Sequence, residues 1–292
     1  MTHPAPAMTH PAPAPGAPCA GLLGDTPLRD YSRKLTRFNA FAEPELRRLI
    51  AGAGLDPGMR VLDAGCGTGE ALPWLREEVT PFGRVTGLDL AQAHVDAARL
   101  HACAEIEVLQ GDLMTAHLAP ASIDFVWCVN TINHLREPIL GVNRLASLLR
   151  PRGRIALGQS SFLPDMYFAW DSRLERVTNE AVRRYYRDRY SLDELDLASV
   201  RRLVGVLRAA NMQNVTARSV LIERVSPVDA ATEAYLLDTI FRETWGERLR
   251  PYLPQEDYAE LASLCDPNDS RFALRRPDFH FLQSFTLVTG EI

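Results

Sequence analysis

The stretch Arg60-Val-Leu-Asp-Ala-Gly-Cys-Gly-Thr-Gly-Glu70 decides how this chain of 292 residues is interpreted. It begins with a short apolar run, which is typical of a buried strand. Three glycines follow as Gly65-x-Gly67-x-Gly69, and Asp63 stands two residues before the first of them. Glycine tolerates positive φ and lets bare backbone amides approach a ligand. The stretch therefore predicts a nucleoside-binding turn, with a coincidental tight turn as the alternative.

The glycine spacing differs from the dinucleotide-binding fingerprint, in which the third glycine falls three places after the second. Glu70 occupies that place here. A carboxylate there would face a pyrophosphate, whereas a ligand with an ammonium group and no phosphate is compatible with nearby acids such as Asp63. The pattern therefore favours a nucleoside that carries an amine over a nicotinamide dinucleotide.

Two further strand patterns also end in an acid. Residues 83–90 and 106–113 each contain a short apolar strand, with Asp89 and Asp112 near the carboxyl ends. A carboxylate in such a position can accept two ribose hydroxyls, although an Asp after a strand often caps a helix or starts a turn. Because all three acids follow strands that alternate with helices, we expect them to share one ligand site.

The next segment continues the alternation. Residues 123–130 form a nearly continuous apolar run, as expected for a central strand buried on both faces. A helix is expected from Pro138 to about Arg150, a turn at 151–153 and a strand at 154–158. This order predicts an α/β fold: a doubly wound, mostly parallel seven-stranded sheet with an antiparallel last strand and helical lid or cap insertions.

Residues 60–160 as a block resemble the class I S-adenosylmethionine (SAM) dependent methyltransferases of the small-molecule type, including the ubiquinone/menaquinone biosynthesis group. The resemblance rests on the glycine motif, on Gly87-Leu-Asp89, on Gln110-Gly-Asp112-Leu and on the turn Leu149-Arg-Pro-Arg-Gly153. It implies SAM as the cofactor. The implied binding residues are Asp63, Gly65, Gly67, Gly69, Asp89, Leu90, Asp112, Leu113 and Asn130.

The resemblance also implies a role for each part of this set. Asp63 and the glycine backbone would lie near the methionine portion, and Asp89 would bind the ribose. Leu90 would pack on the adenine. Asp112 would accept from the adenine amino group, with the backbone of Leu113 beside it.

The strand end at Asn130 would lie next to the sulfonium of SAM. A basic side chain close to Asn130 is therefore a candidate for proton removal from the methyl acceptor. His134, four residues later, is the catalytic candidate because imidazole titrates near neutral pH. A hydrogen bond at a helix start or in a loop is the alternative role for this residue, and His280 is a weaker candidate. His94 departs from the family, because many relatives have an apolar residue there. A base is optional, since alignment of the reactants alone can supply much of the acceleration.

The substrate side is predicted from aromatic residues outside the motif block. Tyr31 precedes the glycine motif and is a candidate contact for the SAM carboxylate or for the substrate, or else a packing residue. Tyr167, Tyr185 and Tyr186 lie in an insertion and are candidate substrate contacts. Aromatic caps of this kind suggest an apolar pocket, although ordinary cap packing explains many such residues.

The expected organisation of the chain follows from these segments. It comprises a disordered Pro/Ala-rich tail at 1–20, N-terminal lid helices at 21–58 with the second opening at Pro44, a SAM-binding half at 59–160, a helical cap insertion at 161–195, a return to the sheet at 196–227, a second helical cap insertion at 228–276 and a closing strand at 277–292.

Composition restricts the classes of partner. The net charge of −5 argues against a nucleic-acid substrate, and we interpret the basic run at 183–189 as a solvated or lid helix. Five cysteines at positions 19, 66, 103, 128 and 265 show no paired spacing, so reduced thiols in a cytoplasm are expected. We expect no metal site and no membrane span, because no segment approaches the required apolar length. The tail lacks the charged start and apolar stretch of a secretion signal.

These observations together predict a cytoplasmic SAM-dependent methyltransferase that acts on a small, mainly apolar metabolite, in secondary metabolism. Oxygen, nitrogen and carbon acceptors remain open, as does the oligomeric state. An NAD(P)-dependent oxidoreductase on a Rossmann-like fold is the first alternative, disfavoured by Glu70. A non-catalytic SAM-binding protein is the second.

Overall fold

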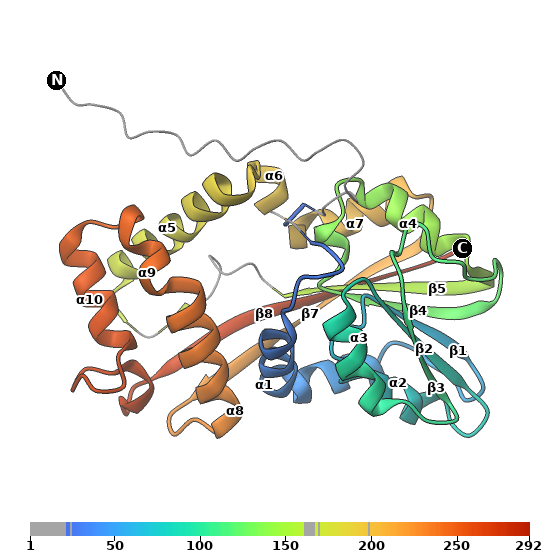
Figure 1. Cartoon of the computed structure of the whole chain (residues 1–292), viewed down its shortest axis with the longest axis horizontal. Coiled ribbons are helices and arrows are strands. Elements are labelled where there is room, and N and C mark those ends of the chain that lie inside the picture. Colours follow the sequence, from blue (N-terminus) through green and yellow to red (C-terminus); the bar gives the residue numbers. More distant parts are fainter. Residues whose placement is uncertain (1–21, 24, 161–166, 169, 198) are drawn as a thin grey trace.

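The computed structural model describes residues 22–23, 25–160, 167–168, 170–197 and 199–292. One mixed sheet runs through the molecule, and helices cover both of its faces (Figure 1). The strands are β1 (Arg60–Ala64), β2 (Arg84–Asp89), β3 (Ile106–Gln110), β4 (Ile123–Val129), β5 (Leu149–Ser160), β6 (Tyr167–Phe168), β7 (Gln213–Val225) and β8 (His280–Glu291).

The helices lie before, between and after these strands. The α-helices are α1 (Ser32–Ala51), α2 (Ala71–Val79), α3 (Gln92–Ala98), α4 (Pro138–Ala146), α5 (Ser172–Tyr190), α6 (Glu194–Leu197), α7 (Ser199–Ala209), α8 (Ala230–Glu233), α9 (Gly246–Leu249) and α10 (Gln255–Cys265). The 3-10 helices are η1 (Arg99–His101), η2 (Ile132–His134), η5 (Arg250–Tyr252) and η6 (Ala273–Arg275), and η4 (Ala234–Trp245) is a π-helix.

The sheet has the predicted mixed character. Its order is β3-β2-β1-β4-β5-β8, in which the first five strands pair in parallel and β8 pairs antiparallel with both β5 and β7. The described strands number eight rather than seven, because the two-residue β6 also pairs with β8. β6 pairs with Phe281 and Leu282 of β8, and β7 pairs with the same two residues from one side. β6 therefore lies on the other side of β8, the side on which β5 also pairs.

The chain order reverses between β1 and β4. From β1 the sheet grows outward through β2 and β3, and the chain then returns to place β4 on the other side of β1. In open parallel sheets, ligands bind outside the carboxyl ends of the strands at such a switch point. The carboxyl ends of β1, β2 and β4 therefore form the expected floor of a ligand site.

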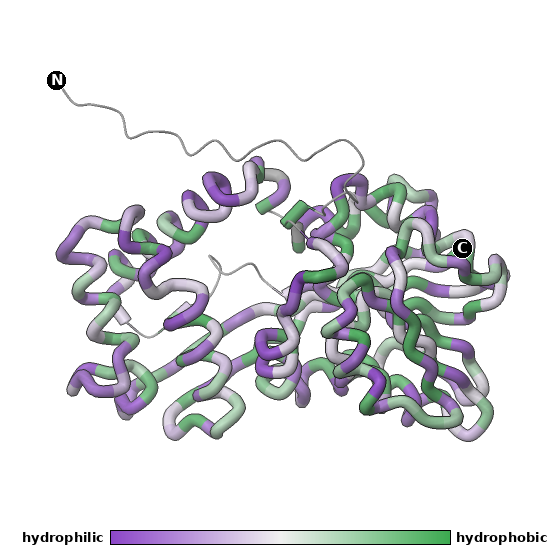
Figure 2. Tube along the Cα trace, viewed as in Figure 1, coloured by the Kyte–Doolittle hydropathy of each residue, from purple (hydrophilic) through white to green (hydrophobic). Residues whose placement is uncertain are grey.

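The core has two layers, one on each face of the sheet. Successive strand residues alternate between them: Val61 and Phe125 pack into the layer under α1 and α2, whereas Leu62 and Val126 pack into the layer under α4 and α7. Burial on both faces explains why these strands are apolar in sequence. Figure 2 shows hydrophobic positions along the sheet and many hydrophilic positions along α5.

The last two strands extend the sheet into the cap. β7 and β8 span 13 and 12 residues, and α5, α8, α9 and α10 gather at the far end of these strands (Figure 1). A cluster of aromatic rings fills this end, in which Phe168 stacks on Trp170 at 4.4 Å between centroids and lies 5.5 Å from Trp245. The aromatic residues of the two insertions thus pack partly with one another.

The prediction of two N-terminal helices is wrong. A single helix, α1, runs through Pro44. Proline removes one backbone donor, and here the loss falls on the exposed side, where Ala40 and Pro44 both face solvent. Phe41, Leu46 and Leu49 continue the buried side across the proline, so packing maintains the helix.

The boundary between α4 and β5 also differs from prediction. The helix ends at Ala146, earlier than expected, and β5 already begins at Leu149. The predicted turn lies inside β5 as an irregularity, since β4 pairs first with Leu149 and then with Arg154. Arg152 adopts a φ of 67° in this bulge. No helix in the described part of the chain is both long and apolar enough to cross a bilayer.

Candidate cofactor and substrate site

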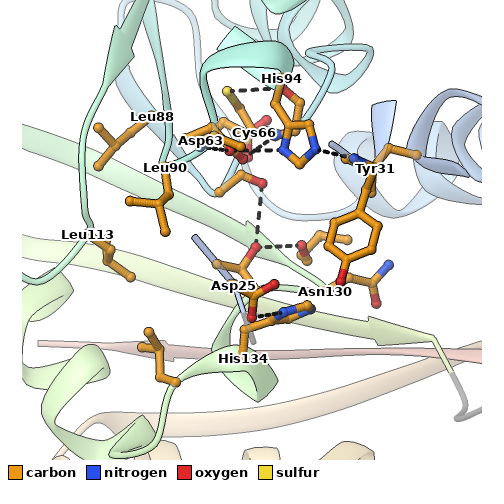
Figure 3. A pocket seen from close by; sticks show the side chains of 18 of the residues that line it. Asp25, Tyr31, Asp63, Cys66, Leu88, Leu90, His94, Leu113, Asn130 and His134 are labelled. Atoms are coloured by element: carbon orange, nitrogen blue, oxygen red, sulfur yellow. Dashed lines mark hydrogen bonds and ion pairs between the residues drawn. The ribbon is translucent and has the colours of Figure 1, made fainter. Parts of the chain in front are cut away.

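A cavity of about 440 Å³ opens at the carboxyl ends of the parallel strands. The residues from the sequence prediction that line it are Tyr31, Asp63, Gly65, Gly67, Asp89, Leu90, Asp112, Leu113, Asn130 and His134. Figure 3 shows several of these side chains around one space. Tertiary folding therefore brings the candidates from β1, β2, β3 and β4 together, as their positions at the strand ends predict.

The glycine loop makes room for this cavity. Gly65 has a φ of 81°, and a Cβ at this position would collide with the side chain of Thr131. Its backbone N–H donates to the carbonyl of Leu88 at 2.7 Å, which ties the loop to β2. The N–H of Gly67 donates to Asp89 Oδ2 at 2.9 Å. The loop is thus held by β2 and cannot accept larger residues without movement.

Asp63 is the most perturbed acid of the site. Its side chain is only 3% exposed, and it forms no hydrogen bond with any described residue. Burial, together with the negative charges of Asp89 and Glu70, raises its pKa to about 8. A buried carboxyl group that faces a cavity without a protein partner is suited to a ligand cation, because a positive charge would stabilise its ionised form.

Asp89 is linked to the start of α1 through His94. Asp89 Oδ1 accepts from the Ala91 N–H at 2.9 Å and lies 3.1 Å from His94 Nδ1. On the other side of the ring, His94 Nε2 accepts from the backbone N–H of Tyr31 at 3.0 Å. Since a backbone N–H can only donate, Nδ1 carries the ring proton and donates to Asp89. His94 therefore connects Asp89, the predicted ribose acid, with the N-terminal end of α1. Figure 3 shows His94 directed toward the backbone of Tyr31.

The remaining strand ends supply one apolar wall and two polar groups. Leu90 and Leu113 line the cavity, and Asp112 Oδ1 accepts from the Met114 N–H at 2.8 Å, which forms a local turn. Asn130 has a φ of 51°, and its Oδ1 accepts from the backbone of Ser160 at 2.9 Å. No described residue accepts from the Asn130 amide nitrogen, which leaves a donor for a ligand.

His134 pairs with an acid that the sequence did not indicate. Its Nδ1 lies 2.8 Å from Asp25 Oδ2, and both residues line the cavity. Burial opposes ionisation of Asp25, but its interactions with His134 and Arg29 outweigh burial and lower its pKa. An ionised Asp25 can only accept, so Nδ1 carries a proton, and in the neutral imidazole Nε2 has the lone pair. This arrangement is typical of an oriented base.

The similarity of this chain to known proteins agrees with this geometry. Residues 61–153 match the model of a methyltransferase domain. These residues form a class I methyltransferase domain. They include β1 through the start of β5 and therefore most of the cavity floor.

Curated relatives of the methyltransferase domain are similar over the same region. The ubiquinone biosynthesis O-methyltransferase of Aeromonas salmonicida is 34% identical over 115 residues, which is 38% of this chain and 47% of the relative. The 27-O-demethylrifamycin SV methyltransferase of Amycolatopsis mediterranei is 33% identical over 122 residues, 40% of this chain and 44% of the relative. The similarity thus spans less than half the length of these relatives.

Solved structures extend the likeness beyond the methyltransferase domain, as fold only. The YcgJ protein of Bacillus subtilis superposes with a TM-score of 0.51 at 14% identity, covering 85% of this chain and 98% of that protein. A protein of Bacillus halodurans gives the same TM-score at 17% identity, with the same coverage. Both likenesses agree with the mixed α/β sheet and its antiparallel last strand.

Several candidates lie away from the cavity of the methyltransferase domain. Gly69 does not line it, and a Cβ there would lie 2.8 Å from the backbone of Ala98, so this glycine permits close packing of α3. Tyr167 is 51% exposed in β6. Tyr185 and Tyr186 lie edge to face on α5, at 5.5 Å between ring centroids, and do not line the cavity. The structure does not bring these three tyrosines to the cavity.

The roles of three other residues near the site depend on tertiary contacts. Asp25 lies next to the expected tail, and its partner His134 is 109 positions away. Glu70 was interpreted only as an obstacle to pyrophosphate, yet it accepts from Thr36 at 2.8 Å and from Asn39 at 2.7 Å. It therefore fastens α1 over the glycine loop. His94 departs from the family pattern in sequence, but its contact with the Tyr31 backbone depends on the tertiary fold.

Proposed function

We propose that this protein is a SAM-dependent methyltransferase that acts on a small, mainly apolar metabolite. The observation that carries the proposal is the pairing of two acids at adjacent strand ends, Asp63 on β1 and Asp89 on β2, around a glycine loop whose backbone faces the same cavity. A nucleoside with a cationic amino acid side arm matches both acids. A pyrophosphate matches neither.

The residues present fit SAM at each of its polar groups. The carboxyl group of Asp63 is buried and has no hydrogen-bond partner among the described residues, which suits it to bind the α-ammonium group. Asp89 lies at the end of β2 and lines the cavity, where it can accept ribose hydroxyls. Leu90 and Leu113 supply apolar contacts for a base, and Asp112 supplies an acceptor beside them. We therefore assign these five residues to cofactor binding, with Asn130 as a donor near the reacting end.

Beyond the residues assigned to the cofactor, the cavity has many apolar lining residues. They include Leu35, Phe38, Leu46, Trp74, Trp127, Val129, Leu135 and Leu140. A volume of about 440 Å³ lies in the range typical of small-molecule sites. These features support a compact, largely apolar acceptor.

Bound SAM would supply an electrophilic methyl group, and the protein would align the acceptor with it. We propose His134 as the base, with Asp25 as the positioning residue that holds the imidazole by Nδ1. His134 Nε2 would remove a proton from the acceptor as the new bond forms. A base in this position favours a hydroxyl acceptor, because a neutral hydroxyl becomes an effective nucleophile only when it loses its proton.

We also propose a place in secondary metabolism and a cytoplasmic location. The rifamycin-modifying relative supports the first. The second is supported by the described cysteines, Cys66, Cys103, Cys128 and Cys265, all of which are free thiols.

The test is calorimetric titration of SAM and S-adenosylhomocysteine into the wild type and Asp89→Ala. We expect the substitution to weaken binding by about 1–3 kcal/mol, the scale for losing charged hydrogen bonds. Asp89 also accepts from two backbone amides, so its loss will lower stability, and the titration must be made well below the unfolding temperature. Asp96→Ala, an exposed acid on α3, is the control and should bind as the wild type does.

Two outcomes would contradict the proposal. Tight binding of NADH or NADPH in place of SAM would favour an oxidoreductase. Binding of SAM with no release of S-adenosylhomocysteine, across extracts supplied with a labelled methyl donor, would favour a non-catalytic SAM-binding protein.

A further inference from the structure

A second cavity, of about 360 Å³, lies in the cap between the end of η4, α9 and α10. No described residue lines both this cavity and the one at the strand ends. α9 and α10 lie at the opposite end of the molecule from α2 and α3 (Figure 1). We call this space the cap cavity. Its volume falls within the range typical of small-molecule sites.

Aromatic side chains from two helices line the cap cavity. Phe241 and Trp245 belong to the π-helix η4, and their rings stack at 5.5 Å between centroids, with 24° between the planes. Tyr258 lines the cavity from α10. π-helical segments are rare and are frequent at functional sites. These walls suit a flat apolar molecule, which can stack on the rings or meet them edge to face.

Trp245 also has a hydrogen-bond donor without an acceptor. This residue is only 1% exposed, and its Nε1 has no hydrogen-bond partner among the described residues. The rings that surround it belong to Phe168, Trp170 and Phe241, and none of these side chains offers a strong acceptor. An unpaired buried donor is costly, so an acceptor on a ligand in the cap cavity would relieve that cost.

The charged residues that line the cap cavity already have partners within the protein. Arg242 pairs with Asp238 at 2.7 Å. Glu247 pairs with Arg250 at 3.2 Å. Asp266 Oδ1 accepts from a backbone N–H at 2.9 Å. A charged ligand would compete with these interactions, whereas a neutral ligand would leave them in place.

We propose that the cap cavity binds a neutral aromatic molecule with a hydrogen-bond acceptor, to which the indole N–H of Trp245 donates. This ligand is separate from the cofactor and the methyl acceptor, because no described residue lines both cavities. It would bind on the helix that supports the lid, since Asp238 and Glu243 of η4 pair with Arg37 of α1 at 2.8 and 2.9 Å.

The test compares quinoline with naphthalene, which have the same fused rings and differ by one ring nitrogen that can accept a hydrogen bond. Equilibrium dialysis against the full chain, at a neutral pH where quinoline is uncharged, measures both affinities. We expect quinoline to bind about fivefold more tightly, the effect of one hydrogen bond. Trp245→Phe keeps an aromatic ring but removes the N–H, so the two probes should bind this variant equally.

A second variant places the probe in the cap cavity without altering the buried rings. Ala262 lines the cavity from the exposed side of α10, so Ala262→Leu should fill part of it and weaken quinoline by about tenfold. Ala259→Leu is the matched control, since Ala259 is exposed on the same helix and does not line the cavity. It should bind quinoline as the wild type does.

Three results would overturn the inference. The first is that quinoline does not bind the wild type, or binds no more tightly than naphthalene. The second is that Ala262→Leu binds quinoline as well as Ala259→Leu does, because the probe would then occupy another site. The third is a preference for quinoline that persists in Trp245→Phe, since another donor would then bind the ring nitrogen. If Trp245→Phe does not fold, the comparison of Ala262→Leu with Ala259→Leu still decides whether the cap cavity is the site.

Discussion

At the scale of single residues, Asp63 lies near the carboxyl end of β1 and has a raised pKa. Its pKa is about 8 in the folded chain against an ordinary value of 3.8. Between these values the folded state binds more protons than the unfolded state, so this residue makes the free energy of unfolding fall as pH rises. The slope can reach about 1.4 kcal/mol per pH unit.

Asp63→Asn should remove this slope. We expect the variant to be more stable than the wild type at pH 8, with a difference that shrinks toward pH 4, as measured by urea unfolding at several pH values without ligand. Asp96→Asn, on the exposed side of α3, should follow the wild type throughout. A wild-type and Asp63→Asn difference that stays constant with pH would show that the Asp63 carboxyl is ionised throughout this range.

His134 is the second residue whose proposed role can be tested. If its Nε2 accepts the acceptor's proton, His134→Ala should lower kcat by about 10²- to 10⁴-fold and leave SAM affinity unchanged. His280→Ala is a suitable control, since that ring pairs with Glu223 at 2.8 Å outside the cavity. Equal turnover in the two variants would assign His134 to loop structure, where its carbonyl already accepts from the Leu22 N–H at 2.7 Å.

At the scale of elements, α1 is attached to the methyltransferase domain by few polar contacts, and His94 makes one of them. His94→Leu removes the acceptor of the Tyr31 N–H, at a cost of about 1 kcal/mol. Hydrogen exchange of the first turn of α1 should therefore become about fivefold faster. Gln92→Ala, on the exposed side of α3, should leave that exchange unchanged. Unchanged exchange in His94→Leu would mean that Glu70 and the apolar contacts alone hold the lid.

The elements also show where local patterns mislead. Pro44 predicted a helix start, and Pro151 predicted the end of the preceding helix at about residue 150. The first proline lies within α1 because buried residues on both sides of it pack against the sheet. The second lies in a bulge of β5, after a helix that ends at Ala146. Proline has no backbone N–H to donate, and tertiary packing decides whether the lost hydrogen bond ends the helix or strand.

At the scale of the whole molecule, one buried ion pair joins the lid to the last strands of the sheet. Arg224 of β7 contacts both carboxylate oxygens of Glu45 in α1, at 3.1 and 2.9 Å, and its guanidinium lies 4.8 Å from the ring centre of Phe41. The Glu45 side chain is only 6% exposed. The pair thus links α1 to β7 through residues that lie 179 positions apart in the chain.

Arg224→Met should lower the free energy of unfolding by about 3 kcal/mol, because it leaves Glu45 buried with a weaker partner. Urea unfolding measures the effect. Arg99→Met, which breaks an exposed pair with Asp96, should cost about 0–0.5 kcal/mol. Adding Glu45→Leu to Arg224→Met should recover part of the loss, since no unpaired charge then remains. Equal stability of the two single variants would mean that solvent replaces Arg224 at Glu45.

Much of the methyltransferase domain was predictable because its signals are local. The glycine motif, the acids at the carboxyl ends of β1 and β2 and the apolar runs of the strands depend on residues close together in the chain. Parallel strands then bring these ends to one edge whatever the details of the helices. For the same reason the positions of Asp63, Asp89 and Asn130 at the cavity followed from their places at strand ends.

By itself, the sequence determined the strand and helix alternation, the glycine loop and the acids that surround the cavity. Only the tertiary structure paired Asp25 with His134, Tyr31 with His94 and Arg224 with Glu45, across 109, 63 and 179 positions. Periodicity and motif spacing describe neighbours along the chain, whereas these pairs depend on how the lid and cap pack over the sheet.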